Sequence, residues 1–239
     1  MSSSTTTSQP IAILSASRTP MGVMMGSLSS ASATQLGAAA ISDALAKAEI
    51  DNNQIDEVLM GCVLSAGVGQ APARQAALAA GLDRSTACTT INKVCGSAMK
   101  AVMMASNALR AGQSKAIVAG GMESMSRAPY LIPQGRQGYR FGPGQLLDHM
   151  QYDGLQDAYQ GVAMGSFAET CAKKYNFSRE DQDAYAIESL RRANRAIDNG
   201  WFKNEVAPVT ISSRRGDTVV DTDEQPGHAP PEKIPQLTS

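Results

Sequence analysis

The first part of the chain alternates between two hydrophobic patterns. Four short runs are nearly continuous in apolar and β-branched residues, as in strands covered on both faces: 10–20, 57–64, 87–94 and 115–121. The first of them ends in a turn at Arg18-Thr19-Pro20. Between these runs, apolar residues recur at helical spacing over 33–49, 72–82 and 96–112. We therefore predict strands and helices in alternation.

This alternation favours right-handed strand–helix–strand crossovers. The expected fold class is α/β, with a parallel or mixed sheet that carries helices on both faces. We place this core at residues 10–124 and expect residues 1–9, which are rich in Ser and Thr, to form a disordered tail.

From residue 125 the pattern changes. A stretch rich in Gly, Pro and Arg without periodicity continues to about residue 149 and predicts a long functional or contact-making loop. Helices are predicted over 161–175 and 179–199, the second starting with a capping-box pattern of Ser178 and Asp181. Strands are expected at 205–211 and 217–224, before a Pro-rich end that is typical of a linker. Residues 125–239 should thus form an α+β loop domain and a linker.

Composition and charge exclude several classes of function. A net charge of −1 gives no reason to expect nucleic acid or a membrane surface as a partner. We expect no transmembrane segment, because no apolar run approaches the roughly 20 residues that a spanning helix needs. With two histidines, His149 and His228, and no C-x-x-C pair, we expect no metal site. The first residues lack a secretory signal pattern, so we expect a cytoplasmic protein.

Cys95 is the candidate nucleophile. It stands between the strand that ends at Val94 and the helix that begins near Gly96. The start of a helix carries unpaired amide groups and partial positive charge, which favour a thiolate and could stabilise an oxyanion. Gly96, Ser97 and Ala98 are small enough to let a substrate approach.

Other interpretations remain open for these residues. A free cysteine is often only a packing residue, and this is what we expect of Cys62, Cys88 and Cys171. His149 and His228 could partner Cys95 in a Cys-His hydrolase, but both lie in predicted loop or linker segments.

The helix after Cys95 is apolar nearly all round. Its methionines, Met99, Met103 and Met104, follow helical spacing and are expected in the core. A helix of this kind should be buried on all sides. We therefore expect a further layer, from another subunit or from a part of the protein outside this chain, to cover its outer face.

Several motifs resemble the thiolase family, in order and at family spacing from about residue 10 to the last residue. They are ILSASRTPMG, GQAPARQAAL, NKVCGSAMKAV, AIVAGGMESMSRAPY, DGLQDAY, MGSFAET, SREDQDAYA and the late DEQP and PEKIP. The resemblance implies a thiolase-like N-terminal core and a loop domain that holds coenzyme A. It also implies a C-terminal core of the same fold, absent from this chain, that packs on the helix after Cys95.

The resemblance implies an acetyl-CoA C-acetyltransferase. Cys95 matches the cysteine that takes the acyl group from a thioester, and Leu155 and Met164 match substrate-pocket positions. Acetyl-CoA and acetoacetyl-CoA would be the substrates, with no further cofactor. Thiolases form dimers and tetramers, and residues 131–149 resemble the loop that joins subunits into tetramers. The family's other catalytic groups, a histidine and a second cysteine, belong to the C-terminal half, so we expect the isolated chain to be incompetent in turnover.

Some positions depart from the family pattern. Many acetoacetyl-CoA thiolases have Tyr-His-Met-Gly where this chain has Val162-Ala163-Met164-Gly165. Gly227 stands near a position where an arginine often contacts the phosphate of coenzyme A. The alternatives are therefore a longer-chain 3-ketoacyl-CoA thiolase, a non-catalytic folding or assembly partner, and another superfamily member of the sterol-carrier or ketoacyl-synthase type.

Overall fold

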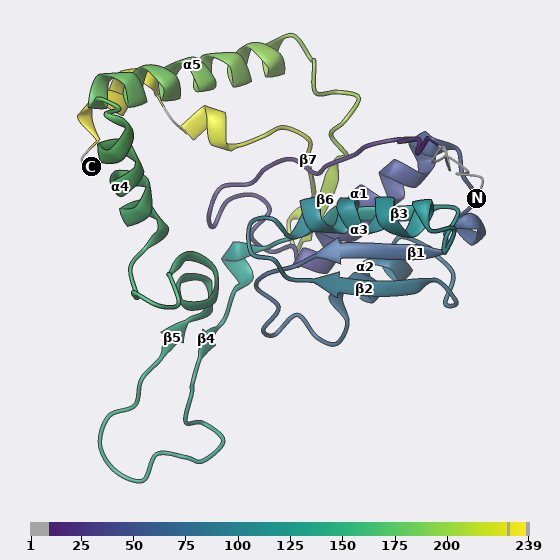
Figure 1. Cartoon of the computed structure of the whole chain (residues 1–239), viewed down its shortest axis with the longest axis horizontal. Coiled ribbons are helices and arrows are strands. Elements are labelled where there is room, and N and C mark those ends of the chain that lie inside the picture. The colour runs from purple at the N-terminus through teal and green to yellow at the C-terminus, as the bar shows by residue number, and fades with distance from the viewer. Residues whose placement is uncertain (1–9, 229, 238–239) are drawn as a thin grey trace, which may run out of the picture. The chain divides into compact units, whose positions relative to one another are not determined.

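The computed structural model describes residues 10–228 and 230–237. The chain forms two compact units, whose elements are labelled in Figure 1. The first unit holds the chain up to Arg18 together with Ser32–Ser124, and the second holds Thr19–Ala31 and Met125–Ser239. The tail predicted over residues 1–9 lies outside the described residues.

A parallel sheet of three strands forms the centre of the first unit. Its strands are β1 (Glu57–Gly61), β2 (Ala87–Ile91) and β3 (Ile117–Gly121), in the order β2-β1-β3. Both outer strands pair with β1 residue by residue in parallel, so the carboxyl ends of all three strands lie at one edge of the sheet. The predicted α/β class is confirmed, and these strands lie where the apolar runs predicted them.

Helices cover both faces of the sheet. α1 (Ala33–Ala48) and α2 (Pro72–Ala79) pack on one face, and α3 (Ser97–Arg110) packs on the other. Successive residues of a strand point to opposite faces. Val58 accordingly joins the cluster under α1 and α2, while Leu59 joins the cluster under α3. Both side chains are almost fully buried, which makes β1 the central strand of the core.

Local signals set the starts of the first two helices. The Ser32 hydroxyl accepts a hydrogen bond from the Gln35 amide, and the Gln35 side chain accepts one from the Ser32 amide, a complete capping box for α1. Pro72 occupies the first turn of α2, where the amide group that it lacks would have no helical partner.

The strand predicted over residues 10–20 is wrong. Apart from a single β-bridge residue at Arg18, these residues form no strand, and Ile13 and Leu14 are 85% and 63% exposed. The segment is held instead to α1, where the Ser15 hydroxyl donates to the Ala44 carbonyl at 2.6 Å. An apolar, β-branched sequence favours a strand, but a strand also requires a partner for its backbone groups.

The second unit begins its main segment with a short hairpin. β4 (Tyr130–Leu131) and β5 (Leu147–Asp148) pair in antiparallel, and an exposed loop joins them. This loop is the unpatterned stretch in the sequence. A π-helical turn, Met150–Leu155, follows β5 and was not predicted.

Two helices follow, as predicted. They are α4 (Met164–Tyr175) and α5 (Arg179–Asp198), and Ser178 forms the predicted capping box with Asp181. The Arg179 guanidinium donates to the carbonyls of Ile234 and Leu237, so the Pro-rich end packs on α5 as 3-10 turns rather than running free as a linker. Among the described residues, no helix is both long and apolar enough to cross a membrane.

The predicted pair of strands is also present. β6 (Val209–Ser213) and β7 (Gly216–Val220) form an antiparallel hairpin. Soon after β7, the Glu224 carboxylate accepts hydrogen bonds from the amides of Val23 at 2.9 Å and Ser27 at 3.0 Å. The Ser27 amide is the main cause that lowers the pKa of Glu224. This clamp ties the loop Thr19–Ala31 into the second unit.

Truncation of Leu59 should destabilise the chain strongly, whereas truncation of Ile13 should not. Leu59→Ala empties a site that is 2% exposed, for a loss of about 2–5 kcal/mol. Ile13→Ala removes a side chain that is 85% exposed and should change stability by less than about 0.5 kcal/mol. Urea unfolding measures both. Equal losses in the two variants would contradict the exposed placement of the first segment.

Candidate active site

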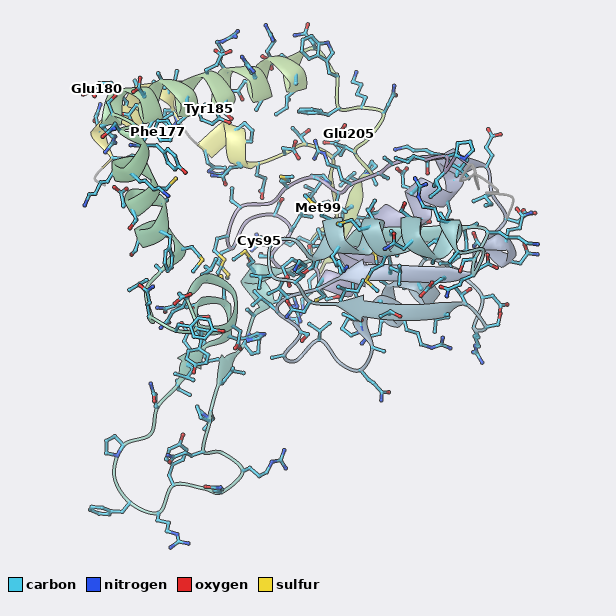
Figure 2. All side chains as sticks on the ribbon, viewed as in Figure 1. Cys95, Met99, Phe177, Glu180, Tyr185 and Glu205 are labelled. Atoms are coloured by element: carbon cyan, nitrogen blue, oxygen red, sulfur yellow. The ribbon has the colours of Figure 1, made fainter. Side chains whose placement is uncertain are left out.

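Cys95 lies in a tight turn between β2 and α3. Its side chain is exposed, and Figure 2 shows it beside the start of α3, near Met99 of the same helix. β2 ends at Ile91 and α3 begins at Ser97, so residues 92–96 carry the chain from strand to helix. The predicted strand–helix junction is therefore confirmed, with the strand ending three residues earlier than Val94.

The turn contains a strained residue directly before the cysteine. Val94 has a φ of 46°, in the left-handed region that β-branched residues rarely occupy. The Asn92 side chain accepts a hydrogen bond from the Val94 amide at 3.0 Å, and the Lys93 carbonyl accepts one from the Gly96 amide at 3.1 Å. Strain of this kind persists where surrounding contacts determine the backbone, and it occurs often at functional sites.

Ser97 fastens the turn to the helix. Its hydroxyl donates to the Val94 carbonyl at 2.6 Å and accepts from the Lys93 amide at 2.8 Å. Ser97 is 5% exposed, so both bonds are shielded from water. These bonds hold the backbone on one side of Cys95 to the first residue of α3 on the other.

Glycines at the strand ends let α3 start close to the sheet. A Cβ on Gly61, the last residue of β1, would lie 2.6 Å from the Ser97 Cβ. A Cβ on Gly121, the last residue of β3, would lie 2.9 Å from the Ala98 Cβ. Real Cβ atoms do not approach so closely, so these two positions require glycine if the helix is to keep its place.

The amides at the helix start do not all remain available to a substrate. The Gly96 amide donates to Lys93 and the Ser97 amide donates to Val94 at 3.0 Å. In this conformation, these two amides therefore cannot serve in the oxyanion role that we predicted for this helix start. The helix dipole still directs partial positive charge toward Cys95.

Cys62, at the end of β1, has a contrasting environment. It is 2% exposed, and its sulfur lies 3.9 Å from a carboxylate oxygen of Glu123. Burial, together with the charge of Glu123, raises the pKa of the Cys62 thiol to about 11. The same carboxylate accepts the amides of Val63 at 2.8 Å and Leu64 at 3.2 Å, and so organises the loop after β1. Cys62 is a packing residue, as predicted.

The remaining cysteines differ in burial. Cys88 is half-buried against the core under α1 and α2, and burial raises the pKa of its thiol. Cys171 is exposed on α4, so its predicted packing role is wrong. The helical spacing of that segment did not reveal which side of α4 is covered.

Leu155 and Met164 belong to the second unit, and the structure brings their segments together. Gln156 and Ala163 form an antiparallel bridge, next to a hydrogen bond of 2.8 Å from the Asp157 amide to the Val162 carbonyl. Leu155 and Met164 flank this bridge and are 40% and 45% exposed. Their role in substrate binding stays a prediction.

The two histidines also lie in the second unit. His149 is 5% exposed, and its Nδ1 lies 2.5 Å from an Asp153 carboxylate oxygen. His228 is exposed in a 3-10 turn. A partnership of either histidine with Cys95 in a Cys-His hydrolase stays a prediction.

The outer face of α3 is exposed in this chain, and its cover by another subunit or by a part of the protein outside the chain stays a prediction. Ala101 and Ala105 face the sheet, whereas Met99, Val102 and Met103 are 71%, 51% and 55% exposed. Of the three methionines predicted in the core, Met104 alone packs there. The described residues cover this helix from the sheet side, and its outer face presents apolar side chains at helical spacing.

Residues 11–237 match the family model of the thiolase N-terminal domain. The chain belongs to the thiolase family. The resemblance carried by its motifs is therefore confirmed, and the match covers nearly all of the described residues.

Known thiolases resemble this chain in sequence and structure. It is 48% identical over 231 residues to an acetyl-CoA acetyltransferase of Saccharomyces cerevisiae, covering 95% of this chain and 58% of the yeast protein. It is 50% identical over 232 residues to the mitochondrial acetyl-CoA acetyltransferase of Homo sapiens, covering 97% and 54%. The crystal structure of Acat5 thiolase from Ascaris suum in complex with coenzyme A superposes with a TM-score of 0.88 at 43% identity, covering 95% and 57%. The chain thus spans little more than half the length of these relatives.

Gly61→Ala should disturb the helix start. The new methyl group would overlap Ser97, so the chain should lose about 1–3 kcal/mol of stability, as overpacked sites do. Gly227→Ala is the control, because a Cβ there meets nothing within 4 Å. Urea unfolding compares the variants, and wild-type stability in Gly61→Ala would contradict the close approach of α3 to β1.

The cysteines should differ in their rate of alkylation. At about pH 8, a thiol with a pKa of about 11 is ionised in roughly one molecule in a thousand, so Cys62 should react with iodoacetamide only after unfolding. The exposed Cys95 and Cys171 should react in the folded chain. Peptide mapping by mass spectrometry measures the order. Early modification of Cys62 would show that the loop after β1 is open.

Proposed function

We propose that this chain carries the acyl-accepting part of an acetyl-CoA C-acetyltransferase. The observation that supports this most is an exposed cysteine in a strained turn, fixed by Ser97 at the start of α3. A nucleophile needs access to its substrate and a rigid backbone that holds it in place, and this turn provides both.

In the proposed step the Cys95 sulfur attacks the thioester carbonyl of acetyl-CoA. A bond forms between that sulfur and the acyl carbon, and the bond from the acyl carbon to the sulfur of coenzyme A breaks. The proton of the Cys95 thiol passes in net to the departing coenzyme A thiol. The start of α3 places partial positive charge beside the attacking sulfur. In the full reaction, Claisen condensation joins the α-carbon of a second acetyl-CoA to the acetyl carbon on Cys95, breaks the bond from that carbon to the Cys95 sulfur and gives acetoacetyl-CoA with a free Cys95 thiol; the reverse reaction cleaves acetoacetyl-CoA.

The proposed substrates are acetyl-CoA and acetoacetyl-CoA. The names of the similar acetyl-CoA acetyltransferases support this choice, and the similar Ascaris protein was crystallised with coenzyme A. We assign Leu155 and Met164 to contact with the substrate, since the bridge beside them brings both to one place. A longer acyl chain is the alternative substrate, because the side chain of Ala163 in that bridge is small.

Self-association is part of this proposal. The loop between β4 and β5 is exposed along its length and includes Phe141, which is fully exposed. An apolar ring in water supports the prediction that this loop contacts another subunit of a dimer or tetramer. The cytoplasmic location remains a prediction, because some similar proteins are named as mitochondrial.

A second candidate function is that of an assembly partner without turnover. The exposed apolar face of α3, formed by Met99, Val102 and Met103, favours it. A surface of this kind gains free energy when another polypeptide covers it. Acyl transfer to Cys95 would decide for the first candidate.

Incubation with acetyl-CoA should add one acetyl group to the chain. We expect an adduct of about 42 Da by intact-mass spectrometry, as for an acyl-enzyme, and its loss in Cys95→Ser. Cys171→Ser is the matched control, since that thiol is also exposed, and it should keep the adduct. An adduct that survives in Cys95→Ser, or none in the wild-type chain, would refute acyl transfer to this sulfur.

A further inference from the structure

His149 is a buried titratable side chain that the proposed acyl transfer does not use. It directly precedes the π-helical turn Met150–Leu155, and its side chain is 7% exposed. Its Nδ1 lies 2.5 Å from a carboxylate oxygen of Asp153, which stands within the turn. A carboxylate accepts hydrogen bonds and an imidazole N–H donates them, so the two side chains are chemically matched partners.

The backbone around His149 is fixed by the hairpin before it. The His149 amide donates to the Pro129 carbonyl at 3.1 Å, next to the pairing of β4 with β5. The Met150 amide donates to the Asp148 carboxylate at 2.9 Å. The imidazole of His149 is thus attached to backbone that these hydrogen bonds fix. Through Asp153 it holds the π-helical turn, which is less regular.

A π-helical turn gains from such a tether. Its wide i to i+5 geometry is rare and occurs mostly as single turns, frequently at functional sites. His149 and Asp153 are four positions apart, so their hydrogen bond ties the start of the turn to its middle. Leu155 is the last residue of this turn, one position before the bridge that brings Met164 alongside.

We propose that His149 and Asp153 are positioning residues that hold Leu155 beside Met164, the two residues that the proposed function assigns to the substrate, and thereby set the size of acyl group that the chain accepts. This inference rests on the proposed function, in which Leu155 and Met164 contact the substrate. When the tether is lost, Leu155 is free to move away from Met164. The chain then accepts longer acyl groups relative to acetyl.

The test compares three variants in the full chain. His149→Leu fills the space without a hydrogen bond, and Asp153→Asn removes the charge at almost constant size. His149→Asn is the rescue variant, because its amide nitrogen can occupy the place of Nδ1 and donate to Asp153. Circular dichroism and urea unfolding establish that each variant folds.

The first readout is hydrogen–deuterium exchange of the peptide that covers residues 150–156. Exchange should be roughly tenfold faster in His149→Leu and close to wild type in His149→Asn, as expected for a local opening. The β6–β7 hairpin, residues 209–220, should not change. Unchanged exchange in the turn of a folded His149→Leu would overturn the inference, because the pair would then hold nothing in place.

The second readout is the ratio of Cys95 acylation rates with acetyl-CoA and butyryl-CoA, followed by intact mass. In His149→Leu and Asp153→Asn we expect a shift of about tenfold toward butyryl, the scale on which apolar pockets discriminate one or two methylenes. His149→Asn should restore the wild-type ratio. A loosened turn with an unchanged ratio would overturn the positioning role and leave acyl transfer standing. If the wild-type chain is not acylated at all, the acyl-transfer proposal fails, and the role of His149 fails with it.

Discussion

The close approach of α3 to the ends of β1 and β3 is the constraint on which the presentation of Cys95 depends. Without side chains at Gly61 and Gly121, the first turn of the helix rests directly on the strand ends. Ser97 can then sit in the buried space below and hold the carbonyl of Val94. The strained Val94 directs the chain so that the next residue is exposed. Two hydrogen atoms in place of methyl groups thus determine where the sulfur of Cys95 lies.

Much of the first unit could be predicted because its signals are local. Helical spacing identified α1, α2 and α3, and short apolar runs identified the sheet strands. The segment around Ile13 failed because a strand depends on its partner, which no local pattern contains. The core placement of Met99 and Met103 failed within this chain for a related reason, since apolar residues show that a cover would be favourable and do not supply one.

The site was predicted only in part. The position of Cys95 between strand and helix followed from the sequence, but the left-handed Val94 and the use of the Gly96 and Ser97 amides inside the turn did not. A β-branched residue gives no signal for positive φ. The π-helical turn and its buried histidine were also missed, because a single irregular turn has no period to detect and a lone histidine carries no pattern. The proximity of Gln156 and Ala163 was missed as well, because no local pattern contains a tertiary contact.

The clamp of Glu224 on the loop near the other end of the chain has a consequence for folding. The hydrogen bond from Val23 joins residues separated by 201 positions, and that from Met21 to Asp223 joins residues separated by 202. The entropy of closing so long a segment must be overcome before either bond stabilises anything. During synthesis on the ribosome, the sheet of the first unit can assemble from nearby segments, while the loop Thr19–Ala31 is clamped only after Asp223 and Glu224 have emerged. The two ends of this clamp are therefore among the last parts of the described chain to reach their folded arrangement.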